Sequence, residues 1–345
     1  MIGVAVIGYG YWGPNLVRNF SGLDDVQLRY VCDLDAKRLS SVQSRYPSVQ
    51  VTDNFDDVIG DPNVHAVAIA TPVSSHYRLA MKALMAGKHV MVEKPICLSS
   101  EEAQRLIDEA AKRRLVLAVD HTFIHTPAVR KMRELAQSSL GSIYYYDSVR
   151  VNLGLFQHDV SVIWDLAVHD LAIMDYVLGQ SPVAVSATGM SHVPGEPENI
   201  AYLTLHFENN LIAHIHVNWL APLKVRRVLI GGSQKMVVYD DLEPSEKIKV
   251  YDKGISLSAG PNLDGDQARR AMVGYRTGDM WAPHLDVTEA LTSELQEFVD
   301  CIKTNRAPTA DGHAGLRVVR ILEAATQSLR QRGRPVEIAV TRQVA

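Results

Sequence analysis

The first residues whose types suggest chemistry stand at the end of an apolar stretch, where Glu93, Lys94 and Pro95 follow residues 88–92. In an open parallel sheet, ligands collect outside the carboxyl ends of the strands, so a lysine there points into the cleft. Pro95 restricts Lys94, and an X-Pro bond in a tight turn is open to the cis form, which would hold the amine in one direction. Lys94 is therefore the first catalytic candidate. The alternative is a solvated turn lysine beside a structural glutamate.

A second candidate pair is Asp165 and His169, four residues apart in a stretch that reads as a helix from Trp164 to Gly179. This spacing places both side chains on one helical face. A carboxylate one turn from an imidazole can hold its tautomer and stabilise its protonated form, as a general acid and base near neutral pH requires. The alternative is an aspartate that caps the helix and a histidine packed within it.

Residues 8–13, Gly-Tyr-Gly-Tyr-Trp-Gly, directly follow an apolar run that suits a buried parallel strand. In a dinucleotide-binding turn, Gly8 would make the tight turn, Gly10 would let the pyrophosphate approach, and Gly13 would let the helix pack closely. The motif alone is weak evidence. It gains support from Asp33, which ends a second strand near the offset expected for the acid that binds a ribose 2′-hydroxyl.

Asp33 also predicts which dinucleotide binds. A carboxylate there would repel a 2′-phosphate and so favours NAD(H) over NADP(H), although Arg38 offers such a phosphate a cation. Thr71, Pro72 and His76 follow a third strand and should lie beside the pyrophosphate and nicotinamide; for His76, a packing role is an equal alternative. The complete predicted cofactor set is Gly8, Gly10, Tyr11, Trp12, Gly13, Asp33, Arg38, Thr71, Pro72, His76, Glu93 and Lys94.

The elements that position these residues change in kind along the chain. Strands and helices alternate up to about His121, which predicts an α/β fold with a doubly wound parallel Rossmann sheet. Longer strands then follow one another and predict a C-terminal α+β domain with a large, open, mainly antiparallel sheet. The predicted domains are 1–121 for the dinucleotide and 122–345 for substrate and oligomerisation, with closing helices at 286–332 able to pack back on the first.

Composition excludes several classes of protein. The 345 residues are 47% hydrophobic with a formal net charge of -4, which leaves no electrostatic footprint for nucleic acid. Cys32, Cys97 and Cys301 lie far apart, which argues against a disulfide framework or a zinc site and favours a cytoplasmic protein. His214 and His216 alternate with apolar residues, as a polar or subunit-facing sheet surface requires, so no metal is predicted. No leader or membrane-spanning run is expected.

Together, the glycine-rich turn with its acidic partner, the turn at 93–95 and the D-x-x-x-H pair resemble the Gfo/Idh/MocA family, named for glucose-fructose oxidoreductase and inositol dehydrogenase. The resemblance spans essentially the whole chain. It implies an oxidoreductase in which Lys94 and His169 flank a reactive carbinol, while Asp165 supports His169 and touches substrate. It also implies a homodimer or homotetramer formed through the second-domain sheet.

One departure from the family pattern bears on the substrate. Where many members have a glycine pair and a further glycine around the D-x-x-x-H motif, this chain has residues 162–164 and Ala167. With the segment 150–157, this resembles members acting on nucleotide-linked sugars, including UDP-N-acetylhexosamine 3-dehydrogenases and deoxysugar 3-ketoreductases. The substrate-binding set is then Lys94, Arg150, Asn152, Asp165 and His169, with Lys224, Arg226, Arg227 and Arg276 as further cations for a diphosphate.

The leading hypothesis is therefore an NAD-dependent dehydrogenase that oxidises a ring hydroxyl of a sugar, with the reverse keto-sugar reduction using the same residues. A first alternative is a free polyol or sugar dehydrogenase of the inositol or glucose type. A second, of another class, is a non-catalytic NAD(H)-sensing protein. The intact Lys94, Asp165 and His169 set speaks against the sensor, which needs no proton-transfer pair.

Overall fold

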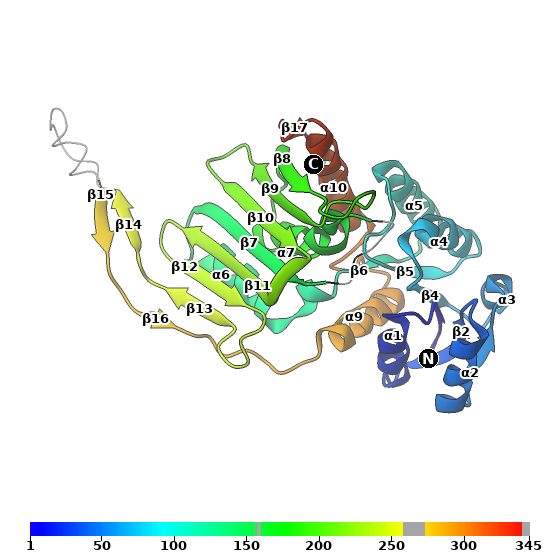
Figure 1. Cartoon of the computed structure of the whole chain (residues 1–345). Coiled ribbons are helices and arrows are strands. Elements are labelled where there is room, and N and C mark those ends of the chain that lie inside the picture. The colour runs from blue at the N-terminus through cyan, green and yellow to red at the C-terminus, as the bar shows by residue number, and fades with distance from the viewer. Residues whose placement is uncertain (155, 157–159, 258–272, 340–345) are drawn as a thin grey trace. The chain divides into compact units, whose positions relative to one another are not determined.

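The computed structural model describes residues 1–154, 156, 160–257 and 273–339. Its contacts divide the chain into two compact units. Unit 1 comprises Met1–Thr126 and Thr288–Glu323, and unit 2 comprises Pro127–Val287 and Ala324–Ala345. Each unit is built around its own sheet, and the last long helix begins in unit 1 and ends in unit 2 (Figure 1).

Unit 1 contains a six-stranded sheet in the order β3-β2-β1-β4-β5-β6, in which every pairing is parallel. This confirms the predicted doubly wound Rossmann sheet. The strands are β1 (Ile2–Ile7), β2 (Val26–Cys32), β3 (Gln50–Thr52), β4 (Ala66–Ile69), β5 (His89–Glu93) and β6 (Leu117–Asp120). The helices are α1 (Gly13–Ser21), α2 (Ala36–Arg45), α3 (Phe55–Gly60), α4 (His76–Met85), α5 (Ser100–Arg113), α9 (Ala290–Thr304), α10 (Gly312–Arg330), and the 3-10 turns η1 (Val73–Ser75) and η2 (Thr122–His125).

The core of unit 1 combines segments from both ends of the sequence. Strand β1 is almost wholly buried, as its unbroken apolar sequence predicts for a central parallel strand. Helix α9 places Leu291, Leu295 and Phe298 in the same core as β1 and α1, at a spacing that keeps them on one helical face. The closing segment 288–323 therefore completes the hydrophobic core of the dinucleotide domain.

Unit 2 contains a nine-stranded sheet in the order β16-β13-β12-β11-β7-β10-β9-β8-β17, antiparallel except where β7 pairs with β10. This confirms the predicted large, mainly antiparallel sheet. The strands are β7 (Ile143–Leu153), β8 (Ala184–Met190), β9 (Ile200–His206), β10 (Ile212–Asn218), β11 (Leu220–Gly232), β12 (Met236–Asp240), β13 (Ile248–Tyr251), β16 (Met280–Trp281) and β17 (Val336–Glu337). The helical segments are α6 (Pro127–Ser138), η3 (Ile163–Ala167) and α7 (Val168–Leu178).

Residues 252–284 are rich in glycine and aspartate, and their sequence is too irregular to assign to helices or strands. In the structure β14 (Gly254–Leu257) and β15 (Val273–Arg276) pair as a separate two-stranded sheet. These strands extend away from the sheet edge formed by β13 and β16 (Figure 1). The residues that join them, 258–272, lie outside the described part of the chain.

The two faces of the large sheet differ as the alternating sequence predicts. On β10, Ala213, Ile215 and Val217 are fully buried, whereas His214 and His216 are half-buried on the opposite face. Within the described ranges, no cluster of histidine, cysteine or acidic side chains could hold a metal ion. No helix described there is long and apolar enough to cross a membrane.

Candidate active site

The glycine-rich turn joins β1 to α1. Gly8 has φ +95°, and a Cβ there would lie 2.6 Å from the Ala70 carbonyl oxygen; a Cβ on Gly13 would lie 2.1 Å from the Gly8 carbonyl oxygen. Both positions thus require glycine for reasons internal to the protein. Gly10 differs, because a Cβ there would meet only the Arg38 guanidinium, at 3.7 Å. Protein atoms leave this side of the turn open, which fits the approach of a pyrophosphate.

Asp33 lies directly after β2 and is buried. Its Oδ2 accepts the Tyr9 backbone N–H at 2.6 Å, and its Oδ1 accepts that of Asp35 at 2.8 Å. Arg38 approaches the same carboxylate at 3.4 Å, with its side chain half exposed. The carboxylate is therefore fixed beside the glycine-rich turn, and the Arg38 guanidinium lies next to it. Ribose binding by Asp33 fits this arrangement and stays a prediction.

The turn after β5 contains a cis Lys94–Pro95 bond, the form that the sequence left open. His76 stands behind this turn with 1% of its surface exposed. Its Nδ1 lies 2.9 Å from the Pro95 carbonyl oxygen and its Nε2 lies 2.8 Å from that of Thr71. Burial lowers the pKa of His76, while the two carbonyls act against that change. His76 thus ties two backbone turns together, which fits the packing role that the sequence left as an equal alternative. A position of His76 beside the cofactor stays a prediction.

Three buried ionisable residues near the same strand ends were missed by the sequence argument. Asp120 ends β6 opposite Glu93 of β5, and the charge of Asp120 acts on the buried Glu294 of α9. His121 follows at once, and neither of its ring nitrogens has a hydrogen-bond partner among the described residues. Burial lowers the pKa of His121 to about 3, and the charge of Lys94 contributes. The strand-end rule that singled out Lys94 would also have found Asp120 and His121.

The D-x-x-x-H pair lies in unit 2 at a change of helix type. Asp165 stands in the π-helical turn η3, and His169 stands in the first turn of α7. π-helical turns inside α-helices often mark functional sites. Asp165 Oδ2 accepts the Trp219 indole N–H at 3.2 Å. Because Trp219 is 1% exposed, it fixes the orientation of Asp165 from the core.

Arg150, one of the predicted substrate-binding residues, pairs with a carboxylate inside unit 2. It is buried on β7, and its Nε lies 2.6 Å from Asp170 Oδ2. Ser148 of the same strand donates to Asp170 Oδ1 at 2.6 Å. The charge of Arg150 is thus balanced inside unit 2, and its contact holds α7 on the sheet immediately after His169. Substrate binding by Arg150 stays a prediction.

Other predicted substrate residues have mixed surroundings. Asn152 lies beside Gly154, whose backbone N–H donates to the Trp219 carbonyl oxygen at 2.9 Å. Lys224 is exposed. The remaining predicted cations contact aspartates: Arg226 with Asp241 at 3.1 Å, Arg227 with Asp240 at 2.8 Å and Arg276 with Asp252 at 3.1 Å. Positions 155 and 157–159 of the segment ahead of the motif lie outside the described residues.

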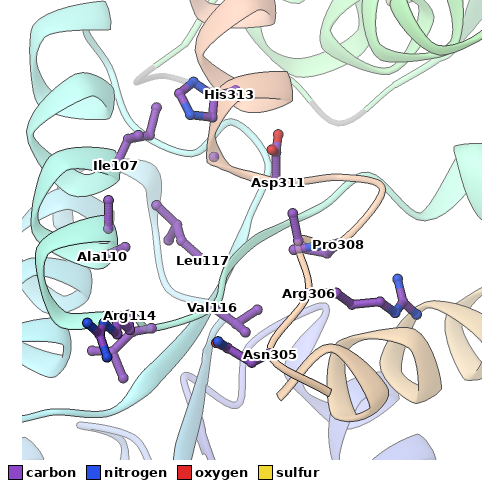
Figure 2. Close-up of a pocket in the computed structure, with 14 residues that line it drawn as sticks. Ile107, Ala110, Arg114, Val116, Leu117, Asn305, Arg306, Pro308, Asp311 and His313 are labelled. Atoms are coloured by element: carbon purple, nitrogen blue, oxygen red, sulfur yellow. The ribbon is translucent and has the colours of Figure 1, made fainter. Parts of the chain in front are cut away.

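A hollow of about 330 Å³ in unit 1 lies away from these groups. Figure 2 shows it between α5, the start of β6 and the segment that joins α9 to α10. Its lining is mainly apolar, with Arg114, Arg306 and His313 among its polar members. Since β6 runs from Leu117 to Asp120, the hollow is at the amino end of that strand, opposite the predicted cofactor edge.

Comparison with protein families matches both parts of the chain. Residues 2–121 match the Gfo/Idh/MocA model described as an oxidoreductase family with an NAD-binding Rossmann fold. Residues 133–338 match the C-terminal alpha/beta domain of the same family. The chain belongs to the Gfo/Idh/MocA oxidoreductase family. As a member of it, the protein is a dehydrogenase acting on CH–OH groups. NAD is its cofactor, as the description of the family's Rossmann domain states.

Relatives in the Gfo/Idh/MocA family act on different carbinols. The chain is 30% identical to the UDP-N-acetylglucosamine 3-dehydrogenase of Acidithiobacillus ferrooxidans over 91% of this chain and 93% of that protein. The solved structure of that enzyme has a TM-score of 0.80 at 27% identity, covering 96% and 99% of the two chains. The myo-inositol 2-dehydrogenase of Thermotoga maritima is 22% identical over 95% and 96%.

A further solved structure shares the fold. GenD2 from gentamicin A biosynthesis, solved in complex with NAD, has a TM-score of 0.81 at 24% identity, covering 98% and 97% of the two chains. That likeness concerns the fold. The residues of this chain that fit NAD are its own: the open side of Gly10, the amino end of α1 and the fixed carboxylate of Asp33.

Proposed function

We propose that the protein oxidises a ring hydroxyl of a nucleotide-linked sugar to a ketone, with UDP-N-acetylhexosamine and its 3-hydroxyl as the favoured substrate and position. The observation that carries this proposal is the likeness, over nine-tenths of both chains, to a UDP-N-acetylglucosamine 3-dehydrogenase. The sequence around Asp165, with residues 162–164 and Ala167 in place of glycines, supports the same substrate class.

Three side chains divide the chemistry. His169 takes the proton of the reacting hydroxyl, and Asp165 orients His169 and stabilises its protonated form. Lys94 stabilises the developing alkoxide by a hydrogen bond and by its charge. NAD supplies the hydride acceptor in oxidation, and NADH supplies the donor in the reverse direction. In this scheme Trp219 helps to orient Asp165 through its indole N–H.

The surroundings of the lysine turn support a catalytic role. A lysine that only faced solvent would not require a fixed turn. His76 nevertheless contacts the Pro95 carbonyl oxygen after β5 and the Thr71 carbonyl oxygen after β4. A preorganised cation stabilises charge better than a mobile one, because little reorganisation is needed during the reaction. This argument favours an enzyme over a protein that only senses NAD(H).

A free polyol is the second candidate substrate. The likeness to a myo-inositol 2-dehydrogenase over almost the whole chain favours it, at lower identity than the sugar-nucleotide relative. Several cations predicted to bind a diphosphate contact aspartates instead, which is also compatible with an uncharged substrate. The two candidates differ in whether the nucleotide contributes to binding.

The deciding experiment incubates the protein with NAD⁺ and a panel of substrates and measures the formation of NADH. The panel contains UDP-N-acetylglucosamine, UDP-N-acetylgalactosamine, free N-acetylglucosamine and myo-inositol, and the Lys94→Ala variant serves as the catalytic blank. We expect turnover of a UDP-sugar, and NMR of the product should place the new ketone at carbon 3. Efficient oxidation of inositol, with no turnover or binding of either UDP-sugar, would exclude the sugar-nucleotide proposal. Tight NADH binding without hydride transfer to any compound would favour the sensor.

A further inference from the structure

A hydrogen bond joins the glycine-rich turn to β6, the strand at one edge of the Rossmann sheet. Trp12 is the residue that precedes α1, and its indole Nε1 donates to Asp120 Oδ2 at 2.7 Å. Asp120 ends β6, 108 residues later in the chain. In the sheet, β4 and β5 separate β1 from β6. One side chain of the glycine-rich turn is therefore anchored beyond β5, the strand that Lys94 directly follows.

The acceptor of this bond lies in a cluster of three carboxyl groups. Asp120 is 3% exposed, and Thr122 donates its hydroxyl to the carboxylate oxygen that Trp12 leaves free. The carboxyl groups of Glu93 and Glu294 lie near enough for the charge of Asp120 to act on both of them. The donors from Trp12 and Thr122 favour the ionised form of Asp120.

The pKa values agree with this assignment. Burial raises the pKa of Glu93 and of Glu294 well above the ordinary value, and the charge of Asp120 raises both further. Burial also raises the pKa of Asp120, but the bonds from Thr122 and Trp12 act in the opposite direction. Trp12 and Thr122 thus stabilise the ionised form of Asp120, while burial opposes it. A hydrogen bond to a buried charge is stronger than one between neutral groups.

We propose that Asp120 is a cofactor-positioning residue that acts through Trp12. The backbone N–H groups at the start of α1 form the site that a dinucleotide pyrophosphate requires in this fold. Trp12 precedes that first turn, so fixing its indole restricts the backbone that presents those N–H groups. The open side of Gly10, in the same turn, leaves the space that the pyrophosphate would fill. Nothing in the fold of β6 itself requires the bond, since its strand pairing is made by the backbone.

The test uses cofactor binding, so it needs no sugar substrate and is independent of the proposed reaction. Affinities for NAD⁺ and for ADP-ribose, which lacks the nicotinamide, are measured by calorimetry on the full chain. The variants are Trp12→Phe, which removes the N–H donor, Asp120→Ala, the double variant, and Asp120→Asn, which keeps an oxygen acceptor without the charge. Trp281→Phe, at an exposed position of unit 2, is the matched control. The melting temperature of each protein without cofactor is recorded in parallel.

We expect Trp12→Phe and Asp120→Ala each to weaken binding of NAD⁺ and of ADP-ribose about tenfold, the size typical of one lost hydrogen bond to a charged group. The double variant should lose no more than either single variant, because both act through one bond. Asp120→Asn should recover part of the affinity, and Trp281→Phe should bind as the wild type does.

Three results would overturn the proposal. The first is wild-type affinity in Trp12→Phe. The second is a double variant whose loss is the product of the two single losses. The third is a fall in melting temperature in these variants with both affinities unchanged, which would make the bond purely structural. If Asp120→Ala fails to fold, Asp120→Asn and Trp12→Phe still decide, because equal affinity to the wild type in both would exclude the role.

Discussion

At Asp33, the carboxylate that faces the glycine-rich turn already accepts two backbone N–H groups, from Tyr9 and Asp35. Its position is therefore set before any ligand arrives. A fixed negative charge accepts ribose hydroxyls at little cost and repels a 2′-phosphate. Arg38, half exposed at 3.4 Å, is the group that could offset part of this repulsion.

We expect kcat/KM for NAD(H) to exceed that for NADP(H) at least about tenfold, which corresponds to a modest difference in binding free energy. Asp33→Ser should reduce this preference for NAD(H) over NADP(H), because it removes the charge. Asp24→Ser, at an exposed turn, should leave the preference unchanged. Steady-state kinetics with both dinucleotides provide the measurement. Equal use of NADPH and NADH by the wild type would contradict the interpretation of Asp33.

Lys94 and His169 carry the proposed proton chemistry. Lys94→Ala should lower turnover about a hundredfold or more while NADH affinity stays within a few-fold, because the amine acts on the substrate oxygen. His169→Ala should lose a similar factor and should also alter the acidic limb of the pH profile for oxidation, since a protonated imidazole cannot accept a proton. The measurements are kcat as a function of pH and an NADH titration.

The control for this pair is Lys112→Ala, an exposed lysine on α5. Parallel loss of NADH affinity and turnover in Lys94→Ala would show that the amine serves the cofactor instead. Full activity with an unchanged pH profile in His169→Ala would show that His169 is not the catalytic base. Glu93 would then be the next acid to test, because it is the ionisable neighbour of Lys94 in the chain.

At the scale of the elements, the contact between α7 and β7 decides where His169 stands. Asp170 follows His169 directly and is bonded to Ser148 and Arg150 of β7 while being almost wholly buried. Removing one member of a buried ion pair leaves the other charge without compensation, which usually costs far more than removing an exposed pair. The position of His169 thus depends on a charge pair inside unit 2.

We expect Arg150→Met to lower the free energy of unfolding by about 3–5 kcal/mol, because Asp170 would keep a buried charge. Adding Asp170→Asn to that variant should restore part of the loss. Arg227→Met, in a more exposed pair with Asp240 on the same sheet, should cost less than about 1 kcal/mol. Urea unfolding of the four proteins tests this. Equal losses for Arg150→Met and Arg227→Met would show that the buried pair contributes no more than a surface one.

At the scale of the whole molecule, buried histidines set the response of stability to acid. Burial lowers the pKa of His121 to about 3, with the charges of Lys94, His125 and Arg317 contributing, and burial also lowers the pKa of His89. The folded protein thus favours the neutral form, while the unfolded chain takes up protons near the ordinary histidine pKa of about 6.5. The stability contributed by neutral His121 is complete above about pH 6.5 and falls as the pH falls toward 3.

We expect the wild type to lose about 2 kcal/mol more unfolding free energy than His121→Leu between pH 7 and pH 5, the window in which only the unfolded His121 binds a proton. The raised pKa values of Glu93 and Glu294 act in the opposite direction, since their protonated forms favour folding at low pH, but they are common to both proteins. His313→Leu, at an exposed position, is the control. Identical pH dependence in His121→Leu and the wild type would contradict the assigned cause.

Local sequence patterns determined much of this protein. Apolar runs, each ended by glycine or a polar residue, identified β1, β4, β5 and β6 within a few residues, because a buried parallel strand needs apolar side chains on both faces. The apolar residues of β2 are interrupted by Gln27 and Arg29. Gly8 and Gly13 were identified as necessary because their reasons are local: a positive φ and a close backbone contact. The change from alternating elements to successive strands indicated the second fold type.

Only the tertiary structure showed the contacts of side chains whose partners are distant in sequence. Arg150 and Asp170 are 20 residues apart, and Trp12 and Asp120 are 108 apart. No periodicity records such pairs, because the energy of a buried charge depends on what the fold brings beside it. For that reason the sequence did not show that Arg150 pairs with Asp170, or which of the two roles considered for His76 the fold supports. The place of Glu294 beside Asp120 became visible only once α9 was placed against the strand ends.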